Sequence, residues 1–431
     1  MGSTVSTLFV TILSVAVMVL KNNNAIKQVL AGKLQNSLSK LNRHIPISTG
    51  FQLSQSPHFS NAIGLVDVYN SLLQLQEYGA RAYQQNAILY HRARALEPTQ
   101  IEQLRTLNYY EKLEQVNESI SVNVKTTQLI VENALTKLLR NNSLDSRDGK
   151  ELISICKGLG YECKQDGVLK RIPVHKITLS PKSNQGRVSE AISHMCRDWH
   201  QSFQNERRPL TEFMISRVRE LKLKGKTLLV VPGSGAGGLA YEIATAFASH
   251  EVHSIELSTL MYLCNDFALD YEGSATIKPF TQHFSGQLST ELQTRPFNIN
   301  FNKVHRPANL KIHLGNFCEF KPQDDYDQII VLSAYFIDTA ENLFDYFDAI
   351  EGLKSSCSKL HWLNVGPLKY GTQPKVQLTD EELSKLREAR KWKDLYHSCN
   401  PKELCGYLTN EKSLYQGYYG LVKFHSVYTG N

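Results

Sequence analysis

The stretch at residues 227–241, TLLVVPGSGAGGLAY, constrains the fold of this chain more than any other. A short apolar run ends at Pro232, and an apolar stretch that favours helix begins a few residues later. Between them lie four glycines, Gly233, Gly235, Gly237 and Gly238. A buried parallel strand, a glycine turn and a helix in this order open a doubly wound α/β sheet. Glycines suit the turn because the backbone must bend sharply and let a ligand approach with no Cβ in the way.

A second strand is predicted at residues 250–257, and it contains Glu256 near its end. A carboxylate at this place can accept hydrogen bonds from both hydroxyls of a ribose, so we expect an adenosine-containing cofactor. The glycines also satisfy G-x-G-x-x-G, which allows a dinucleotide. Strands alternate with helices only after residue 227, however, and the C-terminus is typical of an antiparallel hairpin. This layout favours an S-adenosylmethionine-dependent methyltransferase over a dinucleotide oxidoreductase.

Composition narrows the classes of partner. A hydrophobic content of 42% and a charged content of 21% are typical of a globular protein with a full core. The net charge of +7 comes without a dense basic block, so no nucleic-acid partner is expected. The eight cysteines form no C-x-x-C pair. We therefore expect no metal site and a reducing location, which is the cytoplasm, with the nucleus as an addition.

The chain divides into four predicted parts. Residues 1–21 contain an apolar run at 8–20, which is shorter than the ~17 residues that usually span a membrane. A membrane tether, a weak signal anchor and a misplaced gene start are the open interpretations, and the tether is not favoured. Residues 22–56 are polar and predicted to be a linker. Apolar stripes at helical spacing predict an α-helical N-terminal domain over 57–185, and the cofactor-binding domain follows over 186–431. Within these domains we expect a connecting region over 142–184, a helix over 187–221 and short aromatic strand pieces over 407–428. Thr379 and Glu382 predict a capping box at the start of a further helix.

Four sequence blocks resemble those of the carnosine N-methyltransferases. They are CRDW at 196–199, VPGSGAGGLAYEIA from Val231, YFIDTAENLFDYFDAI at 335–350 and LNVGPLKY at 363–370. The resemblance implies a Rossmann-like class I methyltransferase sheet with an α-helical N-terminal domain and S-adenosyl-L-methionine as the donor. It implies that the acceptor is the imidazole ring of carnosine or a similar His-containing dipeptide, which gives an anserine-type product. A small peptide substrate and a homodimer are the partners expected.

The resemblance also implies roles for individual residues. Cofactor binding is assigned to Arg197, Gly233, Gly235, Gly237, Glu256, Asn316 and Phe317. In this assignment Arg197 reaches toward the carboxylate of the cofactor, and Asn316 and Phe317 flank its adenine. The catalytic, substrate-facing pair is Asn342 and Asp345, which lie one helical turn apart and so share a face. The remaining substrate residues are Tyr407 and Tyr419, which close the pocket.

Methylation of an imidazole ring requires a group that accepts the ring proton, and a carboxylate is suited to this role. A carboxylate that accepts the far ring N–H fixes the tautomer and can then take the proton. We expect Asp345 to do this with Asn342 orienting the ring, whereas the structural alternative is an exposed helix carboxylate. Asp338 follows a buried strand and is predicted either to cap the next helix or to contact the substrate. Trp199, His361 and Trp362 are expected to be structural.

Three positions depart from the family pattern. Asn316 stands where the family has an acid, His194 stands where it has a Gln, and Gly371 replaces a His near the substrate. The change at Gly371 affects the peptide end of the substrate more than the methyl transfer. Two alternatives therefore stay open: a methyltransferase acting on another acceptor such as a protein histidine, and a methyltransferase-like protein that binds without catalysis.

Overall fold

The computed structural model of the chain describes residues 57–59, 65–141, 147–164, 168–172, 184–371 and 373–430. The predicted apolar segment and linker, residues 1–56, lie outside these residues. No helix in the described part of the chain is long and apolar enough to cross a membrane. Residues Gly50–Asn431 form one compact unit, which contains both the helical N-terminal segment and the cofactor-binding segment.

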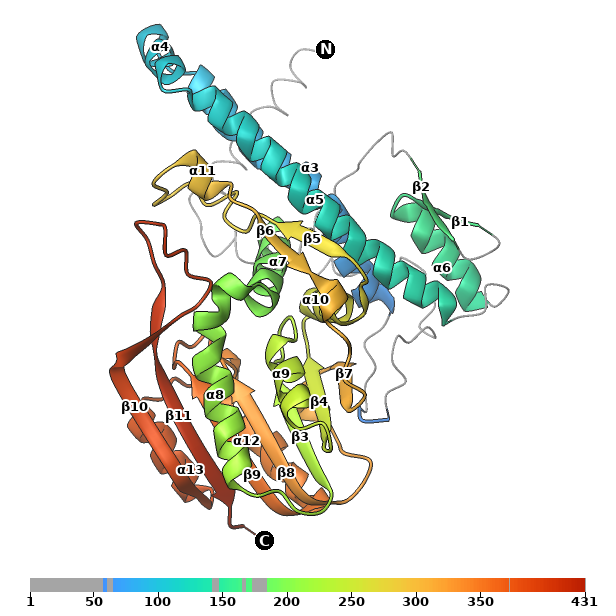
Figure 1. Ribbon diagram of the computed structural model, residues 1–431, viewed down its shortest axis with the longest axis vertical. Coiled ribbons are helices and arrows are strands. Elements are labelled where there is room, and N and C mark those ends of the chain that lie inside the picture. Colours follow the sequence, from blue (N-terminus) through green and yellow to red (C-terminus); the bar gives the residue numbers. More distant parts are fainter. Residues whose placement is uncertain are drawn as a thin grey trace, which may run out of the picture. The chain divides into compact units, whose positions relative to one another are not determined.

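A seven-stranded mixed sheet forms the centre of this unit (Figure 1). The strand order is β10-β11-β9-β8-β3-β4-β7. Strands β7, β4, β3, β8 and β9 run parallel to one another, while β11 is antiparallel to both of its neighbours. Their bounds are β3 (Thr227–Pro232), β4 (Glu251–Glu256), β7 (Leu310–Leu314), β8 (Tyr326–Ala334), β9 (Cys357–Gly366), β10 (Trp392–Gly406) and β11 (Tyr418–Tyr428). The predicted α/β sheet with a reversed C-terminal strand is confirmed.

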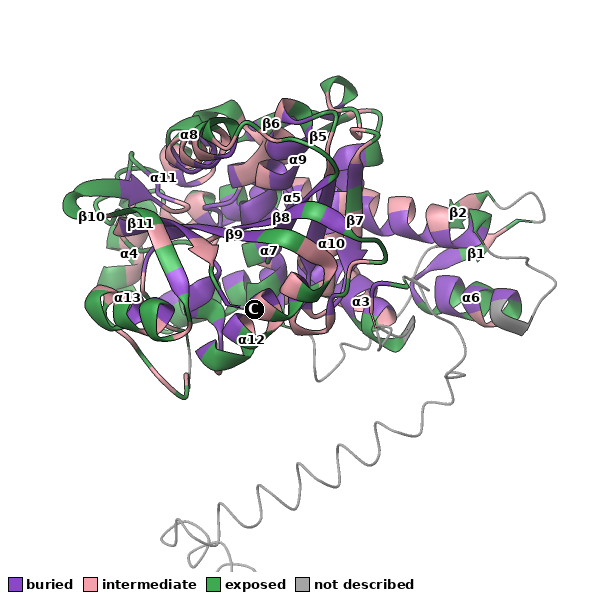
Figure 2. Cartoon of the chain, turned by 90° about the horizontal axis from the view of Figure 1, so that it is seen from below, coloured by how far each residue is buried: buried purple, intermediate pink, exposed green. Residues whose placement is uncertain are grey.

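The central strand β3 is buried on both faces, as its continuous apolar sequence predicts. The neighbouring strands β8 and β9 are also mostly buried (Figure 2). Leu228 and Val230 pack into one hydrophobic core, and Leu229 and Val231 pack into another on the opposite face. The first core is completed by α12 (Leu343–Gly352) and α13 (Asp380–Ala389), and the second by α8 (Gln204–Glu220) and α9 (Gly238–Ala246). Helices on both faces leave the carboxyl ends of the strands as the open edge for a ligand.

The helical N-terminal segment consists of α3 (Leu65–Arg94), α4 (Pro98–Thr106) and α5 (Tyr109–Arg140), and α3 packs along α5 (Figure 1). The side chain of Asn123 on α5 donates to the Tyr78 hydroxyl on α3 at 3.1 Å. The Thr126 hydroxyl donates to the carbonyl of Thr276 at 2.8 Å. This last contact joins the segment to a two-stranded sheet, β5 (Ser274–Ile277) and β6 (Phe297–Asn300), inserted after β4. The helices therefore pack directly on the cofactor-binding segment.

Several elements differ from the sequence expectation. The connecting region 142–184 contains a helix and a hairpin, α6 (Arg147–Gly158), β1 (Tyr161–Cys163) and β2 (Leu169–Arg171). The single helix expected over 187–221 is two helices, α7 (Gln185–Trp199) and α8, because the backbone turns to extended at His200. At the C-terminus the structure has two long strands in place of the short strand pieces expected. The strand β10 was missed because it is a mostly exposed edge strand, and its polar sequence has no alternation of apolar and polar residues. The other helical elements are α10 (Thr259–Asp270), α11 (Thr290–Gln293), η2 (Gln201–Phe203), η3 (Phe301–Lys303), η4 (Phe317–Glu319), η5 (Ile337–Thr339) and η6 (Leu353–Ser356).

Candidate active site

A cavity of ≈ 950 Å³ opens at the carboxyl ends of β3, β4 and β8. This is where the strand order reverses, and doubly wound proteins bind ligands at such a point. Seven residues singled out from the sequence line it: Arg197, Gly233, Gly235, Glu256, Asn316, Phe317 and Tyr407. Gly237, Asn342, Asp345 and Tyr419 do not line it. The volume lies at the upper end of the ~300–1,000 Å³ typical of ligand pockets.

The glycine loop needs its glycines for two different reasons. Gly233, Gly235 and Gly237 all have left-handed backbones, with φ of 58°, 57° and 93°. A Cβ on Gly233 would lie 2.5 Å from the Phe336 ring, and one on Gly237 would lie 2.0 Å from the Asn265 side chain. A Cβ on Gly235 would meet nothing within 4 Å. Gly233 and Gly237 therefore allow the loop to pack, whereas Gly235 keeps space open on the cavity side.

Glu256 lies at the end of β4 with its carboxylate against the same loop. One oxygen accepts the backbone N–H of Gly235 at 2.7 Å, and the other accepts that of Ser258 at 2.7 Å. Burial raises the pKa of this carboxyl, while the backbone N–H donors act in the opposite direction. A carboxylate can accept about four hydrogen bonds. Glu256 can therefore hold the loop and still accept from a ribose.

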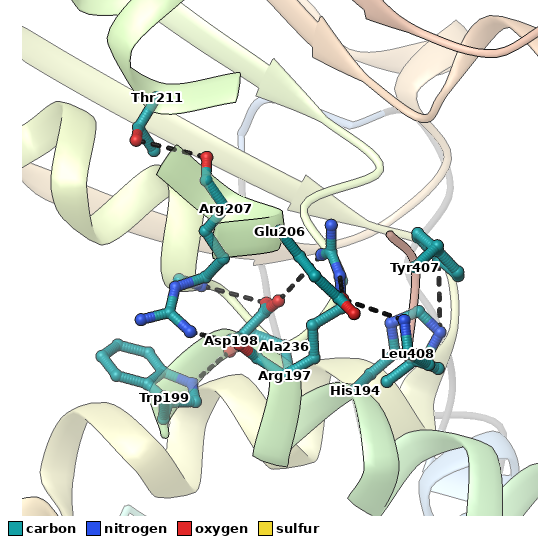
Figure 3. A network of polar contacts seen from close by, with 12 residues as sticks. His194, Arg197, Asp198, Trp199, Glu206, Arg207, Thr211, Ala236, Tyr407 and Leu408 are labelled. Carbon is teal, nitrogen blue, oxygen red and sulfur yellow. Dashed lines mark hydrogen bonds and ion pairs between the residues drawn. The ribbon is translucent and has the colours of Figure 1, made fainter. Parts of the chain in front are cut away.

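Arg197, near the end of α7, lies in a buried polar network (Figure 3). Its Nε donates to Glu206 at 3.2 Å, its Nη1 donates to Asp198 at 3.3 Å, and its guanidinium carbon lies 4.7 Å from the centre of the Tyr407 ring. Its Nη2 is buried and has no hydrogen-bond partner. A buried donor without a hydrogen bond costs free energy of folding. The guanidinium is therefore suited to an anionic ligand in the cavity, such as a carboxylate.

Two neighbours of Arg197 hold the glycine loop in place (Figure 3). Asp198 is partly buried, and its carboxylate accepts the N–H of Gly238 at 3.2 Å. The indole N–H of Trp199 donates to the carbonyl of Ala236 at 2.8 Å, and its ring packs on Tyr241. Trp199 is thus structural, as expected. Asp198 was not predicted as a site residue, although it belongs to the CRDW block that pointed to Arg197.

Asn316 and Phe317, which are predicted to flank an adenine, both line the cavity. The Asn316 side chain accepts the N–H of Cys318 at 3.1 Å and so caps η4, which begins at Phe317. The Phe317 ring is perpendicular to that of Phe336, with centres 5.7 Å apart. Phe336 in turn stacks on Tyr346 at 4.3 Å. A planar base could lie among these rings, and the amide of Asn316 supplies a polar edge beside them.

A second aromatic group lies on the Arg197 side of the cavity. The Tyr407 hydroxyl lies 3.2 Å from Nε2 of His194, and its ring centre is 4.7 Å from that of Tyr335 and 6.2 Å from that of Tyr419. Burial lowers the pKa of His194 to about 3, so this ring is neutral near pH 7. Tyr419 accepts a hydrogen bond from Lys369 at 2.8 Å. Tyr335, which has φ of 51°, was missed because nothing in the sequence marks its backbone.

The predicted catalytic pair starts α12. Asn342 is the N-cap of this helix, and its side-chain nitrogen donates to the Asp345 carboxylate at 2.6 Å. Asp345 is exposed, and Asn342 is partly buried. They lie in the chain between Thr339 and Tyr346, both of which line the cavity. The roles of Asn342 and Asp345 toward a substrate stay predictions.

Asp338 does not cap α12, because Asn342 holds that position. Its buried carboxylate accepts the N–H of Lys369 at 3.0 Å, and burial raises its pKa to about 6. Its backbone carbonyl accepts the N–H of Gly371 at 3.1 Å. Gly371 is exposed, and a Cβ there would meet no atom within 4 Å. Asp338 thus fixes the turn after β9, next to the position where the family pattern has a His.

The donor set fits a cofactor with an adenosine half and an amino-acid half. Glu256 offers the ribose acceptor, the rings around Phe317 offer a place for the base, and the unpaired Arg197 nitrogen offers a carboxylate partner. The Ser234 hydroxyl, which lines the cavity between two of the glycines, also has no hydrogen-bond partner. These features match S-adenosylmethionine, which carries an adenine, a ribose and an amino-acid carboxylate.

Several known proteins are similar to this chain. An uncharacterized protein of Saccharomyces cerevisiae is 43% identical over 404 residues, which cover 91% of this chain and 85% of that protein. The carnosine N-methyltransferases of Schizosaccharomyces pombe and Mus musculus are 29% and 25% identical over 49% and 45% of this chain. The matched parts are 63% and 50% of the length of those two enzymes. A magnesium protoporphyrin IX methyltransferase from Synechocystis aligns over 53% of this chain and 88% of its own at 11% identity, with a TM-score of only 0.32.

The family model for carnosine N-methyltransferase matches residues 174–430, which include the whole central sheet and every residue of the candidate site except those on α3. The chain belongs to the carnosine N-methyltransferase family and is an S-adenosylmethionine-dependent methyltransferase.

Proposed function

We propose that this protein transfers a methyl group from S-adenosylmethionine to a ring nitrogen of carnosine or of a similar His-containing dipeptide. The proposal rests on the cavity, because the glycine loop and Glu256 line one side of it and aromatic residues line the other. Its volume of ≈ 950 Å³ admits a ligand larger than a nucleoside. Family membership supports the imidazole dipeptide as the class of acceptor.

When bound, S-adenosylmethionine supplies a methyl group on a sulfonium, which a neutral nitrogen nucleophile attacks in line. The chain itself positions the partners and excludes water. In our proposal Arg197 binds the carboxylate end of the cofactor and Glu256 binds its ribose. An imidazole has a reference pKa of ~6.5, so near pH 7 most of it is already the neutral nucleophile. In our proposal Asn342 orients the ring, and Asp345 accepts the far ring N–H and takes the proton as the ring becomes methylated.

The direct test is turnover of the purified protein lacking residues 1–22 with S-adenosylmethionine and carnosine. We expect S-adenosylhomocysteine and a ring-methylated dipeptide, both followed by mass spectrometry. The peptide β-alanyl-alanine, which has no imidazole, serves as the control acceptor. Binding of S-adenosylmethionine without any methylated dipeptide would reject the acceptor while leaving the cofactor assignment in place.

The role of Asp345 has a matched control one turn along the same helix. Asp345→Asn keeps the size of the side chain but removes the charge, so we expect kcat to fall by ~10²-fold or more, as loss of a general base does. Asp348 is exposed as well and pairs with Arg390. Asp348→Asn should leave kcat within ~2-fold, since surface ion pairs contribute little. Equal rates for the two variants would remove Asp345 from the mechanism.

A protein histidine is the second candidate acceptor, and the environment of Gly371 favours it. This position is exposed, and open space surrounds the place of its missing side chain. A longer peptide could extend there, where a His would obstruct it. A lysate methylated with isotopically labelled S-adenosylmethionine should then show labelled histidine in protein rather than in small peptides. Gly371→His should shift the preference toward the dipeptide.

A further inference from the structure

Three buried histidines from distant parts of the chain meet beside the β4–β7 edge of the sheet. His253 lies in β4, His313 lies in β7, and His58 belongs to the described segment 57–59. One ligand-capable nitrogen from each lies within 4.8 Å of the others, and in the described part of the chain this is the only such group of three or more. The ring centres are 4.7, 4.8 and 5.0 Å apart. Three imidazoles placed tetrahedrally at a Zn–N distance of ~2.0–2.1 Å would have their centres about 5 Å apart.

Hydrogen bonds on the outer side of two rings select the inward nitrogens. Nε2 of His253 lies 2.8 Å from the Glu251 carboxylate, which favours the proton on this nitrogen and leaves Nδ1, which faces His313, as the ligand atom. Nδ1 of His58 lies 2.9 Å from the carbonyl of Lys321, which leaves Nε2 as its ligand atom. Metal-bound histidines commonly donate their other N–H to a carboxylate or a carbonyl in this way. Nδ1 of His253 lies 3.2 Å from Nε2 of His313, close to the ~3.3 Å edge of a zinc tetrahedron.

We propose that His58, His253 and His313 bind a divalent transition-metal ion, for which zinc is the best match, with Glu251 and the Lys321 carbonyl as outer partners. Three imidazole donors without a thiolate suit zinc, copper or nickel better than calcium or magnesium. Water would complete the tetrahedron. The Glu251 carboxylate is itself held by the Tyr326 hydroxyl at 2.8 Å and by Lys311.

The surroundings of the three rings are apolar and aromatic. The His58 ring stacks on Phe320 at 5.5 Å, and Phe59 lies 5.7 Å from His313. All three histidines are themselves buried.

The position of the cluster suggests what the ion does. Phe59 lies against Gly315, which lines the cofactor cavity. The Lys321 carbonyl that holds His58 follows η4, the turn that starts at the predicted adenine residue Phe317. An ion bound here would fix the segment 57–59 to β4, β7 and this turn. Its role would be structural, and it would be separate from the methyl transfer.

From the sequence we expected no metal site, because the cysteines form no C-x-x-C pair. That argument does not concern a site made of histidines. His58 is far from both other histidines in the chain, and His253 and His313 are 60 residues apart. Only the parallel pairing of β4 with β7 brings the last two together. A second buried pair, His361 and His425, has nitrogens 3.1 Å apart, and no third ligand joins it among the residues that the structure describes, so it provides a matched control.

The test is metal content of the untagged full-length protein after exposure to micromolar zinc and desalting. We expect one equivalent of zinc in the natural protein and in His361→Ala, and loss of that zinc in His58→Ala. His58 lies outside every helix and strand, so its substitution leaves the sheet intact. The proposal is overturned if the natural protein retains no zinc, or if His58→Ala retains as much as His361→Ala does.

A second variant tests the outer partner. Glu251→Gln keeps an acceptor for His253 but removes the charge. We expect zinc affinity, measured by competition with a chelating dye, to fall ~10- to 100-fold. Binding of S-adenosylhomocysteine by the same variant shows that the fold is intact. Unchanged zinc affinity in this variant would mean that the bound zinc is not held beside Glu251, and it would overturn the assignment of the ion to these three histidines.

Discussion

At the scale of single residues, the three loop glycines look equivalent in the sequence and differ in what surrounds them. Gly235→Ala should cost ~1–2 kcal/mol in the free energy of unfolding, because a left-handed alanine is strained. It should also weaken S-adenosylmethionine binding, since the added methyl group enters the open space at the cavity. Gly237→Ala has the same backbone strain and a clash with Asn265 in addition.

We therefore expect Gly237→Ala to lower the melting temperature more than Gly235→Ala does. Calorimetric titration with S-adenosylhomocysteine, performed below both melting temperatures, separates the two effects. The reverse ranking in stability would show that the loop adjusts around Gly237, and that the packing against Asn265 does not hold it.

Asp338 gives the folding stability a dependence on pH with a definite sign. Its folded pKa of about 6 is above the ordinary value of 3.8, so the folded protein keeps this proton where the unfolded chain has lost it. Its contribution to stability is fully present below pH ~4 and is lost as the pH rises through 6. Asp338→Asn cannot ionise but can still accept the Lys369 N–H.

Between pH 4 and 6.5, the natural protein should therefore lose more stability than Asp338→Asn, by about 1.4 kcal/mol for each unit of pKa shift. Urea unfolding at the two pH values measures this difference. Asp325→Asn at an exposed position is the control. Parallel curves for the natural protein and Asp338→Asn would show that this carboxyl titrates normally.

At the scale of elements, α7 acts on the glycine loop through Trp199. Trp199→Phe removes the hydrogen bond to the carbonyl of Ala236 and should cost ~1 kcal/mol of stability. The indole of Trp392, at the far edge of the sheet, donates to Glu351 at 3.0 Å and is also buried. Trp392→Phe should cost a similar amount of stability.

Of these two variants, only Trp199→Phe should weaken cofactor binding, because Trp199 contacts the glycine loop and Trp392 does not. Dissociation constants for S-adenosylhomocysteine and urea midpoints, measured on both variants, test this expectation. A loss of affinity in Trp392→Phe as large as that in Trp199→Phe would mean that overall stability, rather than the α7 contact, limits binding.

The elements also show what the sequence can and cannot predict. The strands β3 and β8 follow from continuous apolar runs, and the capping box of Thr379 and Glu382 starts α13 as expected. The strand β10 could not be predicted, because its stability comes from pairing with β11 rather than from its own polar sequence. In the site, Glu256 could be predicted as a cavity residue because it lies at the end of a predicted strand. Tyr335 and the partners of Arg197 depend on tertiary contacts that no spacing encodes.

At the scale of the whole molecule, the cofactor should stabilise the fold by mass action. A ligand that binds only the folded state at about 100 times its Kd adds ~2.7 kcal/mol to the free energy of unfolding. We expect S-adenosylhomocysteine to raise the melting temperature and NADH, at the same concentration, to leave it unchanged. The opposite result would favour the dinucleotide interpretation of the glycine loop.

The position of β11 in the sheet determines when the strands of the sheet can pair during synthesis. It lies between β9 and β10, and its residue Val427 pairs with His361 of β9. During synthesis β9 and β10 leave the ribosome before the strand that joins them exists. Because chains fold from the N-terminus as they are made, both must wait with an unpaired edge, and such edges invite pairing with other chains. The residues of β11, which are translated after those of β9 and β10, therefore join β10 to the rest of the sheet, and a ribosome that stopped before them would release a chain with two open edges.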